Sequence, residues 1–163
     1  MSAKQIWEDM PKAKRLAVCV AQAEWVAHAA AVGDLKINPD SLDAVIEARR
    51  AVSGCIDTER LKTVTDRAIK VFREESRHYW DAKVNRSLYS PYNQLDQYAL
   101  SYICCVTAAD VYTVISGSTV HPLIGGDLSF DGSVFNYIFR IGDTKKHSPL
   151  AKWISEQDAV LDE

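Results

Sequence analysis

The apolar residues of this chain recur at spacings of three and four in three successive segments, which is the pattern of amphipathic helices. We predict helices over residues 12–32, 41–53 and 58–83. Asp40 or Ser41 would cap the second, Gly54 would end it, and Asp57 would cap the third. The apolar series of the second helix is Leu42, Val45, Ile46 and Ala48 or Arg49. The predicted inward stripe of the first helix is Leu16, Val20, Ala23, Ala27 and Ala30, with Trp25 and His28 at its edge. That of the third is Leu61, Val64, Ala68, Val71, Phe72, Tyr79 and Ala82.

A fourth segment, residues 91–116, is apolar on almost every side. Ser90 suits an N-cap, Pro91 suits a first helical turn, and Gly117 suits the left-handed residue that ends a helix. Asp96 and Asp110 are the only charged residues in the segment, so it has little polar surface to present to water. We therefore predict a long buried helix that the other helices surround.

The same segment is a poor membrane span. A spanning helix needs about 20 apolar residues, whereas only residues 98–109 lie free of charged and amide side chains between Gln97 and Asp110. The N-terminal residues lack the continuous apolar region of a secretory signal, because charges and Pro11 interrupt them. We expect a cytoplasmic protein that does not interact with membranes.

The composition changes after Gly117 to Ser, Gly, Thr, Pro and aromatic residues. Residues 118–147 are predicted to form an appendage, for which we favour a hairpin turning at Asp131-Gly132. The hairpin would alternate Phe135, Tyr137, Phe139 and Ile141 with Asn136 and Arg140. The alternative is a short helix capped by Asp131 and ended by Gly142, with Phe135, Ile138 and Phe139 on one face. Another short helix is predicted over residues 149–157.

These elements indicate a mainly α fold, a helical bundle around a long buried fourth helix. At 163 residues the chain suits one domain, residues 1–163, with its helical core in 12–116. The four cysteines include no C-x-x-C pair, and we expect buried free thiols. The net charge is −3 and no basic face is evident, so we expect no nucleic-acid partner.

Few residue patterns point to catalysis. No phosphate-binding glycine loop and no nucleophile motif occurs. Glu75 and His78 form the E-x-x-H spacing that supplies half of a di-iron site in helical bundles. For the rest of the site the chain offers Glu24 with His28, four residues apart, and Glu47, which the pattern does not place. A metal-dependent bundle enzyme that uses the two Glu–His pairs is the alternative function; the interpretation that we favour requires no catalytic residue and no cofactor.

Aromatic and arginine residues cluster where the third helix is predicted to end. Tyr, Trp and Arg dominate the energetically important positions of protein interfaces. We therefore predict a partner-binding surface, or alternatively a set of rings that closes one end of the bundle. The residues are Arg77, Tyr79, Trp80, Arg86, Tyr89 and Tyr92.

One stretch resembles a known family. Pro39-Asp40, the run Ala44-Val45-Ile46-Glu47-Ala48-Arg49-Arg50, and Gly54 before a long helix from Asp57 are similar to the opening of a helical immunity-protein domain found beside bacterial polymorphic toxins. The resemblance covers residues 16–72. It implies a non-catalytic protein that neutralises a toxin by binding it. We therefore expect an inhibitor or immunity-type protein, bacterial or phage-encoded, whose partner is a toxin, a defence-system component or another protein.

Overall fold

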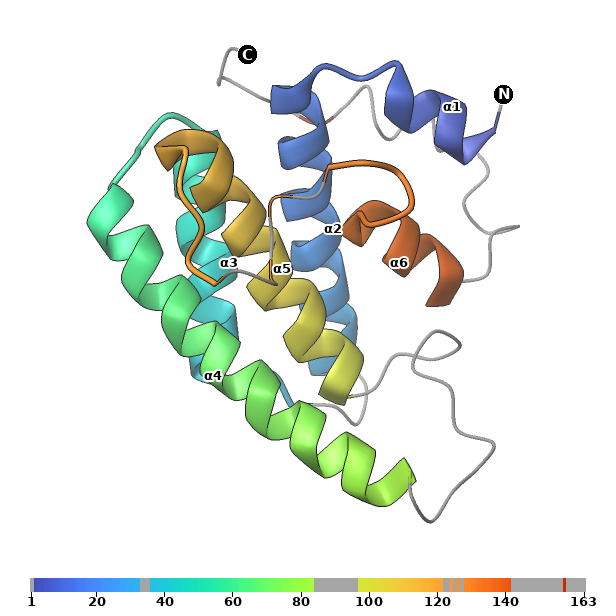
Figure 1. Cartoon of the computed structure of the whole chain (residues 1–163), viewed down its shortest axis with the longest axis vertical. Coiled ribbons are helices and arrows are strands. Elements are labelled where there is room, and N and C mark those ends of the chain that lie inside the picture. The colour runs from blue at the N-terminus through green and yellow to red at the C-terminus, as the bar shows by residue number, and fades with distance from the viewer. Residues whose placement is uncertain are drawn as a thin grey trace.

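The computed structural model describes residues 2–32, 36–83, 97–121, 124, 126, 128–141 and 157, and these residues form a mainly helical bundle (Figure 1). No strand occurs in these ranges. One isolated antiparallel β-bridge there pairs His121 with Ile124. The helices are α1 (Ala3–Glu8), α2 (Lys12–Val32), α3 (Pro39–Val52), α4 (Thr58–Lys83), α5 (Gln97–Ser116) and α6 (Val134–Ile141).

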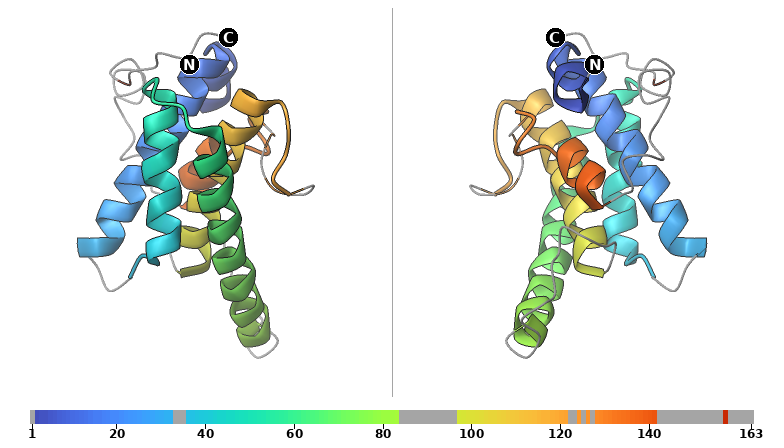
Figure 2. Two further views of the ribbon diagram at one scale, coloured as in Figure 1. Left: turned by 90° about the vertical axis from the view of Figure 1, so that its left-hand side faces the viewer. Right: turned by 90° about the vertical axis from the view of Figure 1, so that its right-hand side faces the viewer.

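Helix α5 lies at the centre of the bundle. It contacts α2, α3, α4 and α6, and α4 crosses it as the longest neighbour (Figures 1 and 2). A continuous run from Ile103 to Tyr112 is buried on all sides. The prediction that this helix is surrounded by the others is confirmed. It begins at Gln97 in the structure, and the predicted first turn at 91–96 lies outside the described residues.

The other helices bury most of the apolar residues predicted to face inward. In α4, Leu61, Val64 and Ala68 are buried and Val71 and Phe72 are half-buried, while the side chains of Tyr79 and Ala82 are not described. In α3, Val45 and Ala48 are buried, but Leu42 and Ile46 are exposed, which corrects their predicted place in the apolar series.

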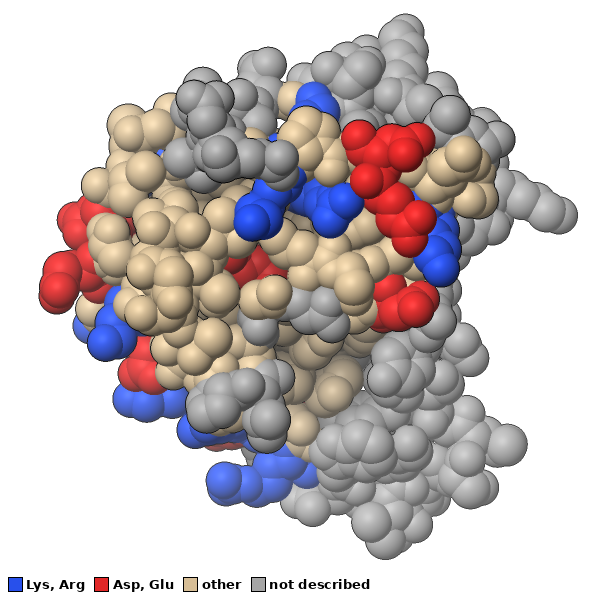
Figure 3. Space-filling model, turned by 45° about the horizontal axis from the view of Figure 1, so that its top comes forward, with Lys and Arg blue, Asp and Glu red and all other residues tan. Residues whose placement is uncertain are grey.

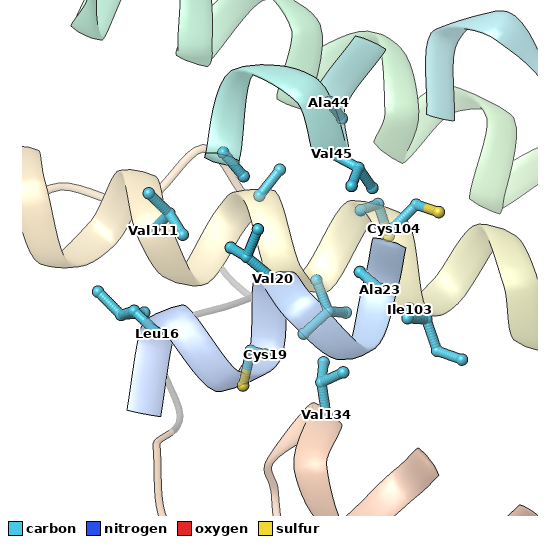
Figure 4. Packing of buried hydrophobic residues seen from close by; sticks show 14 of the residues in the cluster. Leu16, Cys19, Val20, Ala23, Ala44, Val45, Ile103, Cys104, Val111 and Val134 are labelled. Carbon is cyan, nitrogen blue, oxygen red and sulfur yellow. The ribbon is translucent and has the colours of Figure 1, made fainter. Parts of the chain in front are cut away.

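In α2, Leu16, Val20, Ala23, Ala27 and Ala30 are all buried. Figure 4 shows that Val20 and Ala23 of α2 and Ala44 and Val45 of α3 converge on α5 near Cys104. Because many of these side chains are small, the helices pack closely. The inward side of α3 is therefore packed against the other helices without large gaps.

Local chemistry explains where α3 and α4 begin and end. Asn38, rather than Asp40 or Ser41, caps α3, since its side chain accepts a hydrogen bond from the N–H of Asp40 at 2.9 Å. The C-terminus of α3 is a Schellman turn: Gly54 has φ 99°, and the N–H of Cys55 donates to the carbonyl of Arg50. Asp57 accepts from the N–H of Arg60 and caps α4, as predicted.

The appendage forms helix α6, so the favoured hairpin is wrong and the alternative short helix is present. Its cap is Ser133, whose hydroxyl accepts from the N–H of Asn136 at 3.0 Å, rather than Asp131. Phe135 and Ile138 are buried against the bundle. Helical spacing places both in the core together, whereas strand alternation would have sent them to opposite faces. Gly142 and the predicted 149–157 helix lie outside the described residues, except for Gln157.

Helix α5 is long and apolar enough to cross a membrane by length and composition, with a mean hydropathy of 1.5 in its most apolar window. In the folded chain, 72% of that window is buried within the protein. This burial is compatible with a core helix of a water-soluble bundle.

Candidate protein-binding surface on α2 and α3

Large apolar side chains are exposed on the outer side of α2 and α3. Among the described residues, Trp25 is 55% exposed, Leu42 37% and Ile46 41%. Leu42 and Ile46 are four residues apart, so they lie one above the other on the outer stripe of α3. Trp25 lies on the outer stripe of α2, with the exposed residues Glu24 and His28. We call these three apolar residues the α2–α3 surface.

An ion pair joins the two stripes. The guanidinium of Arg49 donates to the carboxylate of Glu24 through Nε and Nη2. Its Nε lies 3.1 Å from Oε1 and 3.2 Å from Oε2. Nη2 lies 2.5 Å from Oε1. Glu24 precedes Trp25 directly, and Arg49 follows Ile46 on the next turn, so the ion pair connects α2 and α3 at the level of these apolar residues. Figure 2 shows α2 and α3 side by side on this side of the bundle.

A pocket lies at the turn between α3 and α4, beyond the end of the same stripe. Its floor is Glu47, a carboxylate with only 3% of its side chain exposed. Nη1 of Arg50 and Nε of Arg60 each donate to Oε1 of Glu47 at 2.8 Å. Burial of a charge is costly unless it is paired and hydrogen-bonded, and these two arginines provide the pairing. The exposed Ile56, 46% accessible, forms part of the rim.

The outer face of α4 carries the predicted charged side chains: Arg60, Lys62, Arg67, Lys70, Arg73 and Glu74 are all exposed. Acidic residues are interleaved with them, and Lys70 pairs with Asp66 at 3.5 Å. Figure 3 likewise shows basic and acidic groups side by side on the face in view, without a continuous basic area among the described residues. Such mixed surfaces are typical of a solvated helix face.

Two of the predicted metal residues, Glu24 and Glu75, lie beside different parts of α3. Glu24 is bound by Arg49 near the end of α3, whereas Glu75 lines a small crevice with Asn38 and Ser41 near its start. Ser41 and Arg49, their neighbours on α3, are separated by about 12 Å along the helix. Glu24 and Glu75 thus have different neighbours in the structure, and the shared metal site stays a prediction. No group of three or more metal-binding side chains occurs among the residues described; the side chain of His78 is not one of them.

The predicted partner-binding cluster lies mostly beyond the described structure. Arg77 is exposed on α4, as that prediction requires. The side chains of Tyr79 and Trp80 are not described, and Arg86, Tyr89 and Tyr92 fall in the undescribed 84–96 segment. This cluster stays a prediction.

Sequence reasoning missed the α2–α3 surface and the pocket. Trp25 was expected at the edge of a buried stripe, but more than half of it is exposed. Glu47 had a detectable signal: it occupies an inward position among Ala44, Val45 and Ala48 and has an arginine three residues later. A glutamate at an inward position requires a positively charged partner, and its second partner comes from α4.

The cysteines are free, and three of the four are buried as expected: Cys19, Cys104 and Cys105. Burial raises the pKa of all three thiols, that of Cys104 to about 12, and the nearby Asp110 further raises the pKa of Cys19 and Cys105. Cys55 corrects the prediction, because it is exposed and lines the α3–α4 pocket. The chain therefore presents one accessible thiol among its four.

Comparison with known proteins found no matching family model, no matching curated protein and no matching solved structure. The resemblance to immunity-protein domains therefore stays a prediction from the sequence.

Proposed function

We propose that this chain is a non-catalytic binding protein that neutralises a partner protein, as an inhibitor or immunity-type protein does, and that the α2–α3 surface makes the contact. The observation that carries the proposal is the exposure of three large apolar side chains, Trp25 on α2 and Leu42 and Ile46 on α3, two helices that the Glu24–Arg49 ion pair connects. Tryptophan is usually well buried, and at interfaces it is among the residues that contribute most to affinity.

Two further features support this surface as a binding site. The α3 backbone beneath it is held by a packed core, since Ala44, Val45 and Ala48 are buried. A rigid helix loses little conformational freedom when it binds, so more of the contact energy appears as affinity. The Glu24–Arg49 pair supplies a partly exposed polar group beside the apolar residues, in the manner of an interface rim.

The test begins with the products of neighbouring genes, each co-expressed and purified with this chain. For a partner that forms a stable complex, Trp25→Ala combined with Ile46→Ser should raise Kd by about 30-fold or more, since truncation of an interface hot spot costs at least about 2 kcal/mol. Lys70→Ala on the outer face of α4 is the matched control and should leave Kd unchanged. An unchanged Kd for the double variant, with the partner still bound, would contradict the proposed surface.

The sequence-predicted cluster at the end of α4 is tested separately. Tyr89→Ala with Arg86→Ala should weaken the same complex with little change in Tm if these residues touch the partner. Several degrees of destabilisation would instead indicate that the rings close the bundle. A chain that binds no protein but turns over a small molecule would contradict the binding function altogether.

A further inference from the structure

The α3–α4 pocket is built around two arginines that share one buried carboxylate. The cavity measures about 490 Å³, is open to solvent, and is lined by Glu47, Arg50, Gly54, Cys55, Ile56, Asp57 and Arg60. Arg50 and Arg60 both donate to the same oxygen of Glu47, yet their side chains remain 57% and 54% exposed. Each guanidinium therefore donates one N–H to Glu47 and has further N–H groups that can donate to another acceptor.

The charges of this arrangement do not cancel within the triad. Two guanidinium groups surround a single carboxylate, so the Glu47–Arg50–Arg60 triad carries one excess positive charge. The other acid of the lining, Asp57, caps α4 through the N–H of Arg60, and the helix N-terminus compensates part of its charge. A single additional carboxylate would balance the excess charge of the triad. A phosphate dianion would meet about twice the repulsion from Glu47 and Asp57 that a carboxylate meets.

The pocket is continuous with the α2–α3 surface. Leu42, Ile46 and Arg50 succeed one another at intervals of four residues, so they follow one stripe of α3 from the apolar residues to the pocket. Ile56 supplies an exposed apolar group at the far rim. A partner that covers Leu42 and Ile46 would find Arg50 one helical turn further along α3.

We propose that the α3–α4 pocket binds an aspartate or glutamate side chain of the partner protein, a proposal that rests on the proposed binding function. The carboxylate accepts hydrogen bonds from Arg50 and Arg60, which Glu47 holds in place, and the carbon chain of the acid contacts Ile56. Arginine suits this role because its planar group presents several donors toward a carboxylate.

Cys55 allows a test with the chain alone. The protein is equilibrated at neutral pH with equal amounts of the disulfides of mercaptopropionate and of mercaptoethanol, a neutral thiol of similar length. Exchange converts the Cys55 thiol and a small disulfide into a mixed disulfide and one released small thiol. Mass spectrometry of the intact protein measures the ratio of the two adducts. The buried thiols of Cys19, Cys104 and Cys105 remain protonated and inaccessible.

The mercaptopropionate adduct should exceed the neutral one by about two- to five-fold, the range expected for a solvent-exposed ion pair. The excess should disappear in Arg50→Gln and in Arg60→Gln. It should persist in the control Arg49→Gln, whose guanidinium is bound to Glu24 instead. Equal adducts in the unsubstituted chain, or an excess that survives both pocket variants, would overturn the proposal.

Competition separates a carboxylate site from a general anion site. Added acetate should reduce the excess at lower concentration than chloride or inorganic phosphate at equal ionic strength. Stronger competition by phosphate would overturn the carboxylate assignment. The competition experiment needs no variant, so it tests the preference for a carboxylate even if an arginine variant fails to fold.

The outcome is independent of the partner search. If the mercaptopropionate adduct is in clear excess but no protein partner is found, the proposed function is contradicted and the carboxylate-binding pocket is still supported. Conversely, if Arg50→Gln leaves the Kd of a partner unchanged and the two adducts form equally, the pocket proposal is rejected. The proposal for the α2–α3 surface is then unaffected.

Discussion

The guanidinium of Arg15 lies over the indole ring of Trp7, with Cζ 5.5 Å from the ring centroid. Its Nε donates to the backbone carbonyl of Trp7 at 3.0 Å and Nη2 to that of Glu8 at 3.0 Å, so it satisfies the end of α1. The indole N–H donates to the carbonyl of Leu128 at 2.8 Å, and the ring stacks on Phe135 of α6. Trp7 and Arg15 thus connect α1, Leu128 and α6 to α2.

Trp7→Ala should lower the free energy of unfolding by about 3–5 kcal/mol, because it empties a fully buried site and removes the indole donor to the carbonyl of Leu128. That carbonyl then keeps the longer hydrogen bond from Nη1 of Arg15, at 3.3 Å. Trp25→Ala is the matched control: its side chain is 55% exposed, so the loss should stay within about 1 kcal/mol. Urea titration measures both. Equal losses for the two variants would contradict the difference in burial between Trp7 and Trp25.

The triad of Glu47, Arg50 and Arg60 should show non-additive energetics. Arg50→Gln or Arg60→Gln alone should cost about 1 kcal/mol, because the remaining arginine still pairs with Glu47. The double variant leaves a buried carboxylate unpaired and should cost about 3–5 kcal/mol. Adding Glu47→Gln to the double variant should restore part of the loss. A double-mutant cycle of unfolding free energies that closes additively would show that the arginines do not share Glu47.

The buried thiols predict alkaline destabilisation. Since burial raises the pKa of the Cys104 thiol from 9.0 to about 12, the folded chain keeps a proton that the unfolded chain releases between these values. Stability is therefore fully present below pH 9 and falls as pH rises toward 12. Each such thiol contributes a slope of up to about 1.4 kcal/mol per pH unit. Unfolding measured from pH 8 to 11 should show a shallower decline for Cys104→Ala, whereas Cys55→Ala should follow the unsubstituted chain.

Gly126 and Gly117 should differ in their tolerance of alanine. Both have positive φ, 86° and 73°. A Cβ at Gly126 would lie 3.2 Å from Cγ2 of Thr113, whereas one at Gly117 meets nothing within 4 Å. Moreover, the N–H of Gly126 donates to Oδ1 of the buried Asp110. Gly117→Ala should cost about 1 kcal/mol from backbone strain alone, and Gly126→Ala should cost more. Thermal unfolding of the two variants provides the comparison, and a smaller loss at Gly126 would contradict it.

The positions of α2, α3 and α4, most of α5, and the buried stripe of α2 could be predicted from the sequence, whereas the inward face of α3 was predicted only in part. Helical periodicity is a local property, since residues three and four apart share a face whatever the rest of the chain does. The turn chemistry of Gly54, Asp57 and Gly117 is equally local, because a glycine with positive φ or a carboxylate cap acts within a few residues.

The tertiary structure decided which residues meet across helices and which apolar residues stay exposed. Helix α6 prevailed over a hairpin because it buries Phe135 and Ile138 together, with Phe135 stacked against the distant Trp7. The exposure of Trp25 and the pairing of Glu47 with Arg60 depend on how α2, α3 and α4 pack. Periodicity states which face of a helix is apolar, but contacts between segments far apart in sequence follow from the packing of whole helices.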